Sequence, residues 1–138
     1  MARVATSILA VLFGAIASGS IRSAEATDYR CHLPLITSVN ALNGTLTMGT
    51  SQDETVDFTI RIPPSNEYAE VEGVRFAIYE GSGFLTLYGR GSGVAQGGDM
   101  ITIFGDKIGS GFYSVESRHV VIMGKPLPSL SAGICTPS

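Results

Sequence analysis

The sequence predicts an all-β fold: a single small antiparallel sandwich or closed barrel of about eight short strands. Beyond residue 26, apolar residues alternate with polar ones at a period of two, which is typical of strands with one buried face. Glycine-rich turns separate these stretches at hairpin spacing, and no segment beyond residue 26 has the apolar spacing of a helix. These observations do not distinguish a sandwich from a barrel.

The first predicted hairpin lies near the start of the domain. Residues 35–39 (LITSV) and 45–49 (TLTMG) flank the sequence ALNG. Asn-Gly is a strong hairpin signal because both residues tolerate a positive φ, so we predict a turn at Asn43-Gly44. The same two residues form an N-glycosylation sequon with Thr45, which makes Asn43 a candidate glycosylation site.

The later strands are predicted from the same alternation. In residues 54–62 (ETVDFTIRI) and 73–80 (GVRFAIYE), apolar side chains occupy every second position, so both segments predict half-buried antiparallel strands. The remaining predicted strands have similar lengths and a similar β-branched or aromatic content, and they are residues 84–90, 100–104, 112–117 and 119–123.

Three segments are predicted to lie largely outside these strands. Residues 63–73 begin with two prolines, which end a strand, and continue as a polar loop. The glycine-rich stretch GRGSGVAQGGD at 89–99 predicts two turns flanking a short strand. The C-terminal segment 124–138 is proline-spaced, and we expect it to be extended and attached to the body through Cys135.

The first 26 residues have the features of a secretory signal peptide. Arg3 precedes an apolar run from Val4 to Ala17, shorter than the ~20 residues that span a bilayer, and a small-x-small cleavage site, AEA, follows. An uncleaved N-terminal anchor is the alternative. We therefore predict a signal peptide over 1–26 and a single all-β domain over 27–138, secreted to the extracellular space or the periplasm.

The two cysteines lie near the two ends of this predicted domain. In an oxidising compartment, Cys31 and Cys135 are expected to form one disulfide. Two free thiols, or an intermolecular bridge, are the alternatives. Two cysteines supply too few soft ligands for a structural zinc site, and we expect no metal and no cofactor.

Charge and motifs exclude several function classes. The formal net charge is −3 and the basic residues form no cluster, which argues against a nucleic-acid or anionic-lipid partner. No apolar run after residue 26 is long enough to span a membrane. The stretch at 89–99 lacks both the lysine of a Walker loop and the glycine register of a dinucleotide fingerprint, and the nucleophile elbow G-x-S-x-G is absent. His32 and His119 are interpreted as structural or exposed, although a Ser-His-Asp triad stays an alternative because triads are recognised by geometry.

Four residues at predicted loops or strand ends are candidate partner-binding residues. Tyr68 would be an exposed aromatic in the polar loop, and Arg90 would be displayed where a strand enters a glycine-rich loop. Ser110 and Tyr113 belong to a predicted turn and the strand that follows it. The alternative interpretation of each is an ordinary solvated or core position.

Two short motifs resemble the secreted and periplasmic lysozyme inhibitors. One is Tyr29-x-Cys31 near the start of the domain together with a cysteine close to the C-terminus, and the other is S-G-F-Y at residues 110–113. The second is similar to the S-G-x-Y loop that such inhibitors insert into the lysozyme cleft. The resemblance implies that Ser110 and Tyr113 would meet the catalytic carboxylates of a lysozyme. The chain departs from the family in its longer spacing between the first and last cysteines.

The sequence favours a protein that acts by binding and not by catalysis. Rigid strands that present several glycine-rich loops are a common scaffold for binding, and a protein partner is expected, with the chain acting as an enzyme inhibitor or an effector. Carbohydrate is an alternative partner, which the lack of tryptophan disfavours. A secreted hydrolase of unidentified substrate and a structural component of the envelope or cell surface are alternatives of other classes.

Overall fold

The computed structural model describes residues 27–42, 45–90, 95–122 and 125–138, and the regular secondary structure in these segments consists of strands alone. The predicted signal peptide and Asn43 lie outside the described residues. The strands are β1 (Thr27–Leu42), β2 (Thr45–Ser51), β3 (Val56–Ile62), β4 (Tyr68–Val71), β5 (Val74–Gly81), β6 (Phe84–Arg90), β7 (Ala95–Ile108), β8 (Gly111–Ile122) and β9 (Lys125–Pro137).

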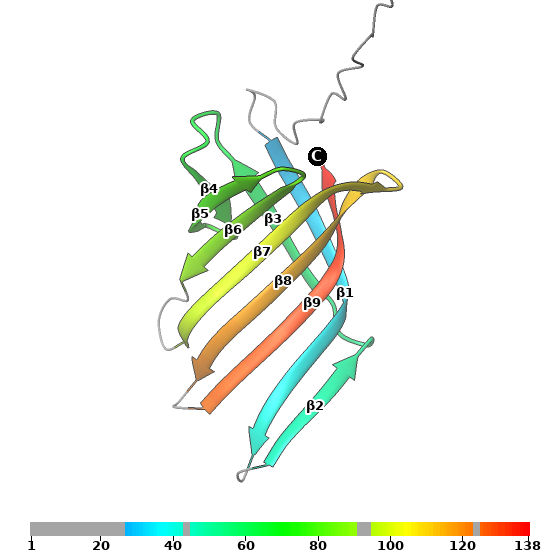
Figure 1. Ribbon diagram of the computed structural model, residues 1–138, viewed down its shortest axis with the longest axis vertical. Coiled ribbons are helices and arrows are strands. Elements are labelled where there is room, and N and C mark those ends of the chain that lie inside the picture. Colours follow the sequence, from blue (N-terminus) through cyan, green and yellow to red (C-terminus); the bar gives the residue numbers. More distant parts are fainter. Residues whose placement is uncertain (1–26, 43–44, 91–94, 123–124) are drawn as a thin grey trace, which may run out of the picture.

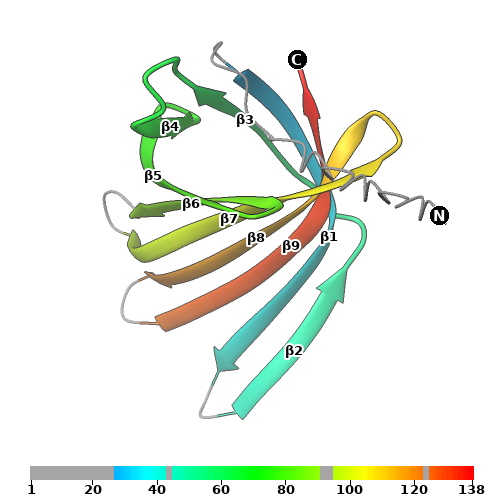
Figure 2. The same ribbon diagram turned by 45° about the horizontal axis from the view of Figure 1, so that its top comes forward.

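Eight of these strands close into an antiparallel barrel (Figures 1 and 2). From β3 to β9 each strand pairs with the next, and β1 completes the ring by pairing with both β3 and β9. The ninth strand, β2, pairs with β1 through residues 36–42 and lies beside the ring. The barrel alternative of the sequence prediction is therefore the one observed. We call the end where β6 leads to β7 and β8 leads to β9 the lower end, as drawn in Figure 1.

Alternate side chains point into the barrel, as the period of two predicts. On β3, Phe58, Ile60 and Ile62 are buried, while the residues between them are exposed. Across β6 and β7, inward-facing residues lie directly opposite one another, and the buried cluster continues around the ring. Its members are Tyr29, Cys31, Leu33, Phe58, Ile60, Ile62, Ala69, Val71, Phe76, Leu85, Leu87, Ile101, Ile103 and Cys135.

The predicted disulfide joins the two strands that close the barrel. Cys31 on β1 lies directly opposite Cys135 on β9, and the two are bonded to each other. Both are buried, with 104 residues of sequence separation between them. The bond therefore fixes the pairing of the first and last strands, which is the contact of longest range in the ring.

Three strand predictions need correction. The predicted polar loop at 63–73 contains β4, whose Ala69 and Val71 complete the core between β3 and β5. The predicted strands 112–117 and 119–123 are parts of a single strand, β8. The predicted C-terminal tail is a strand, β9, that pairs with β8 on one side and β1 on the other.

The C-terminal segment is extended and attached through Cys135, as predicted, but it was not predicted as a strand because the inward face of β9 carries little apolar alternation. Its inward positions include Ser129, Ser131 and Gly133, and small residues there do not produce a period-two hydrophobic pattern. An alanine at position 133 would overlap the backbone of β1, so this strand approaches its neighbour too closely for a side chain.

The glycine-rich stretch at 89–99 is more regular than the two predicted turns. Gly89 and Arg90 end β6, and residues 95–99 already belong to β7, while residues 91–94 lie outside the described segments. Gly97 has a φ of 133°, and a Cβ atom there would overlap the carbonyl oxygen of His119 on β8. Only glycine fits this close approach of two strand backbones.

Candidate functional site

Two adjoining hollows lie on the inner surface of the barrel towards its lower end. The smaller has a volume of about 260 Å³ and lies between β3, β4 and β5 on one side and β6, β7 and β8 on the other. The larger has a volume of about 790 Å³ and lies against β1, β2, β8 and β9. Val56 and Arg118 line both hollows. We call the two hollows together the cup.

The two parts of the cup differ in chemistry. Half of the residues that line the smaller hollow are apolar, and they are Val56, Phe58, Val71, Val74, Phe76 and Ile101. The other half are charged, and they are Asp57, Glu72, Arg90, Asp99, Glu116 and Arg118. Six residues with hydroxyl groups line the larger hollow beside the apolar Ile36, Val56, Val120 and Leu127, and the six are Ser38, Thr50, Ser51, Thr55, Ser129 and Ser131. We call the smaller hollow the apolar chamber, after the apolar half of its lining, and the larger one the hydroxyl-lined chamber.

A charged triad of Asp99, Glu116 and Arg118 lies at the junction of the two chambers. Asp99 on β7 is directly opposite Arg118 on β8, and Glu116 shares the inner face of β8 because it is two residues away. The Nε–H of Arg118 donates to Oδ1 of Asp99 at 3.2 Å, and its Nη2 donates to Oε1 of Glu116 at 2.8 Å. Glu116 is 4% exposed, whereas the Arg118 side chain is 42% exposed. Arg118 is thus the member of the triad that faces the open space.

Burial raises the pKa of the Glu116 carboxyl above its ordinary value of 4.5. The Arg118 charge opposes this shift, the nearby Asp99 charge adds to it, and hydrogen bonds from Arg118 and Ser131 again oppose it. The desolvation of the carboxylate is the largest of these effects, so the proton is held more strongly than by an exposed glutamate.

The sheet register places small residues next to the guanidinium. Arg118 is opposite Ser129 on β9, and Ser129 is a neighbour of Ser38 on β1 in the same row across the sheet. These short side chains leave space beside Arg118. A guanidinium has five N–H donors, of which the two acids occupy two; among the residues that the structure describes, the other three have no acceptor. They are available to a ligand or to water.

Arg90 lies at the rim of the apolar chamber, at an exposed position that alternates with the inward-facing Leu87 and Gly89 of β6. It ends β6 at the lower rim and lines the smaller hollow together with Arg118. Within the described segments Arg90 makes no ion pair, and its side chain is exposed. Of the four candidate residues predicted from the sequence, Arg90 is the one that lies in the cup.

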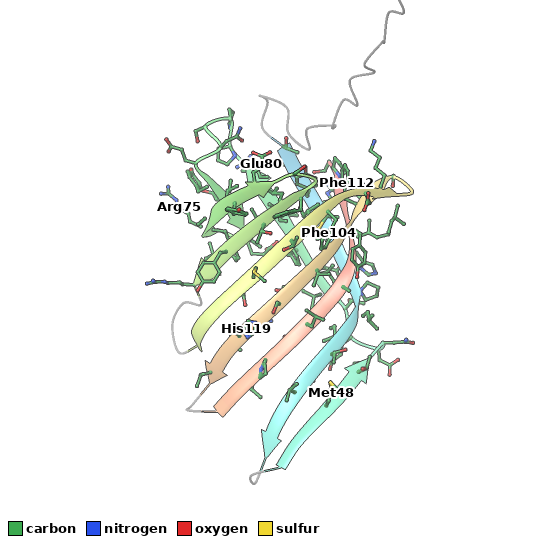
Figure 3. The ribbon with its side chains drawn as sticks, viewed as in Figure 1. Met48, Arg75, Glu80, Phe104, Phe112 and His119 are labelled. Atoms are coloured by element: carbon green, nitrogen blue, oxygen red, sulfur yellow. A yellow bond between two sulfur atoms is a disulfide. The ribbon has the colours of Figure 1, made fainter. Side chains whose placement is uncertain are left out.

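The other three candidates lie elsewhere on the barrel. Tyr68 begins β4, and the Arg75 guanidinium stacks 4.4 Å from the centre of its ring. Tyr113 lies on the outer side of β8, with its ring 5.5 Å from that of Phe104, which Figure 3 shows towards the upper end of the barrel. Ser110 is in the turn between β7 and β8 at the same upper end. The structure therefore does not bring the four residues into one site.

The two histidines are on the outer surface. Nδ1 of His32 lies 2.7 Å from Oδ1 of Asp57, and both side chains are well exposed. Ser110 lines the same outer hollow, of about 650 Å³, but among the described residues no hydrogen bond joins it to His32. His119 contacts the hydroxyl of Ser117 at 2.8 Å. Among the described residues, His32 is therefore bonded to an acid but to no hydroxyl, and His119 is bonded to a hydroxyl but to no acid, so neither forms a Ser-His-Asp triad.

The charged triad was missed by the sequence prediction. The signal was a strand whose polar residues fall on one face: Ser114, Glu116 and Arg118 alternate with Val115 and Ser117. In most half-buried strands such a face is turned to solvent, whereas here it faces the barrel interior.

The buried carboxyl predicts a specific dependence of stability on pH. Because the pKa of Glu116 is raised in the folded protein, the folded protein keeps a proton that the unfolded chain releases above about pH 4.5. The contribution of Glu116 to the free energy of unfolding therefore falls as the pH rises above about 4.5 towards the folded pKa. We therefore expect Glu116→Gln to gain stability relative to the wild type as the pH rises above about 4.5, measured by urea unfolding at a series of pH values. The lowered pKa values of Asp57 and Glu72 act in the opposite sense in both proteins and cancel in this difference. Parallel stability curves for the two proteins would contradict the assignment.

Within the described segments, no group of three or more metal-binding side chains gathers at one place, and no helix is long and apolar enough to cross a membrane. A comparison of the chain with protein-family models, with curated proteins and with solved structures finds no match.

Proposed function

We propose that the protein is a secreted or periplasmic binding protein that holds a small amphipathic carboxylic acid in the cup. The observation that supports this most directly is Arg118, an inward-facing guanidinium held by two carboxylates between an apolar chamber and a hydroxyl-lined one. A buried disulfide is compatible with an oxidising compartment such as the extracellular space or the periplasm.

The apolar chamber would take the hydrocarbon part of the ligand. Its volume of about 260 Å³ is slightly below the range of pockets for drug-sized molecules, so the ligand is a small one. Val56 and Val74 supply the apolar surface of this chamber that is still exposed, and covering them removes that surface from water, whereas Phe58, Phe76 and Ile101 are already buried.

The carboxylate of the ligand would bind at the guanidinium groups. Arginine is the side chain best suited to a carboxylate, because its planar N–H groups match both oxygens. Arg118 has unused donors and Arg90 lies at the lip of the same chamber. The raised pKa of Glu116 favours this pairing, since Glu116 can take up a proton and remove a negative charge beside the incoming anion.

Octanoate and octan-1-ol are suitable probes because they share a chain and differ in the head group. We expect the wild-type protein to bind octanoate at least about tenfold more tightly than octanol, which corresponds to one charge-assisted hydrogen bond, in titrations followed by NMR or calorimetry. Arg118→Met should abolish this preference, and Arg90→Gln should weaken octanoate binding without affecting the fold, since its side chain is exposed.

Arg61→Met is the matched control. Arg61 is an exposed arginine on the outer side of β3, where it lies 3.9 Å from Asp28. It should leave octanoate binding unchanged. An absence of octanoate binding at millimolar concentration, or equal losses from Arg61→Met and Arg90→Gln, would overturn the proposal.

A protein partner, acting as the target of an inhibitor or effector, is the second candidate. It is favoured by the exposed apolar side chains on the outer faces of neighbouring strands: Tyr79 on β5, Tyr88 on β6 and Met100 opposite it on β7. If carboxylate probes do not bind while the full chain inhibits a lysozyme or a protease at near-stoichiometric ratios, this candidate replaces the first.

A further inference from the structure

One strand of the protein presents a free edge. Barrel closure pairs β1 and β9 with each other, whereas β2 is the terminal strand of the sheet order and pairs with β1 alone. Figure 2 shows β2 beside the ring and on the far side of β1 from β9. The edge runs over Thr45–Ser51, and its backbone groups on the outer side have no neighbouring strand in the described chain.

This edge lacks the protection that sheet edges usually carry. The sequence TLTMGTS contains no charged residue and no proline, and the pairing of β2 with β1 has no register shift. Met48 is 75% exposed and lies at the midpoint of the strand (Figure 3). An uncharged, regular edge with an exposed apolar side chain at its centre is a template for another strand.

We propose that two copies of this chain associate by antiparallel pairing of their β2 edges, which forms a continuous sheet across a two-fold axis. This inference does not depend on the proposed ligand. Antiparallel pairing is self-complementary, because each copy offers the same donors and acceptors in opposite direction. A strand without charge meets its own copy without repulsion. Pairing centred on the strand midpoint places the two Met48 side chains opposite each other on one face, which covers the most exposed of the large apolar side chains.

The proposed dimer would also extend the cup. Gly49, Thr50 and Ser51 of β2 line the larger hollow, so a strand added to the β2 edge continues the wall of that hollow. The two-fold axis of an antiparallel strand pair is perpendicular to the sheet, and the two cups would therefore open on the same side.

The first test is the association state of the full secreted chain, with its disulfide intact, measured by sedimentation equilibrium over a range of concentrations. We expect a concentration-dependent dimer. Met48→Lys places two like charges opposite each other and should weaken dimerisation at least tenfold. Ile108→Lys is the matched control, since Ile108 is also an exposed apolar side chain but lies on β7, and it should leave the association unchanged.

The second test addresses the register. Met48→Cys should form an intermolecular disulfide under mild oxidation, seen as a dimer on a non-reducing gel, and Ile108→Cys should not. A monomer at every concentration would overturn the proposal, as would equal weakening by the two lysine variants. A wild-type monomer that instead pairs with an extended peptide of another protein would assign the edge to a different partner and would also overturn it.

Discussion

Removing the Cys31–Cys135 disulfide is expected to lower the free energy of unfolding by about 2–5 kcal/mol. The cross-link closes a sequence separation of 104 residues, so the unfolded chain loses a large part of its conformational freedom when the bond is present. In addition, β1 and β9 are paired across nearly the whole length of the domain sequence. Without the disulfide, this long-range pairing carries a large loss of conformational entropy.

Urea unfolding of the double variant Cys31→Ala/Cys135→Ala measures this effect. Wild-type protein in the presence of a reductant should unfold at a similarly low urea concentration. The reductant should not change the unfolding of the double variant, which serves as the control for side effects of the reagent. Equal unfolding midpoints for the oxidised wild type and the double variant would show that the disulfide does not stabilise the pairing of β1 with β9.

Replacing Gly97 by alanine is expected to produce the second large loss of stability, of roughly 3 kcal/mol or more. Two independent effects would destabilise the folded Gly97→Ala variant. The φ of 133° is unfavourable for any residue with a Cβ atom, and that atom would overlap the carbonyl oxygen of His119 on the neighbouring strand. The strands β7 and β8 would have to separate in the lower part of the barrel, next to the opposed pair of Asp99 and Arg118.

Gly49→Ala is the matched control for this substitution. Gly49 is also a strand glycine, but an added Cβ would meet no atom within 4 Å and its φ is not positive. Thermal unfolding should show a shift within about 0.5 kcal/mol for the control. A similar small shift for Gly97→Ala would contradict the close approach of the two backbones.

The parts of the fold that the sequence predicted well are those where one strand face is apolar. In β3 and β6 the inward residues are large and apolar and the outward residues are polar or exposed, so the period of two was visible. The β1–β2 hairpin was also predicted, since Leu42 pairs with Thr45 across the Asn43-Gly44 sequence. Local pattern and tertiary position agree in these strands.

The parts that were missed lie around the cup. The inner face of β8 and β9 carries serines, glycine and charged residues, which in isolation indicate an outward face or a loop. Which face of such a strand is inside depends on barrel closure, and closure is a long-range property that no local pattern encodes. Arg90 is exposed at the end of a strand, as the sequence predicted, but the local pattern did not indicate that it lines the apolar chamber.

The polar lining is also the physical argument for a binding site. A barrel interior that served stability alone would place apolar side chains at positions 116 and 118, since a buried ion pair is often less stabilising than a well-packed apolar pair. The chain instead keeps an acid that is 4% exposed beside a guanidinium with unused donors. Such an arrangement is expected where a ligand supplies the remaining partner.

A ligand site in the cup can be located by mapping octanoate onto the protein through the change in amide chemical shifts. We expect shifts at the inner-facing residues that surround Arg118, including Ser129 on β9 and Ile101 on β7, with saturation at a single affinity. The same titration of Arg118→Met should leave these amides unperturbed. Shifts confined to outer-face residues such as Tyr88 and Tyr113, or the same pattern in Arg118→Met, would contradict a ligand site in the cup.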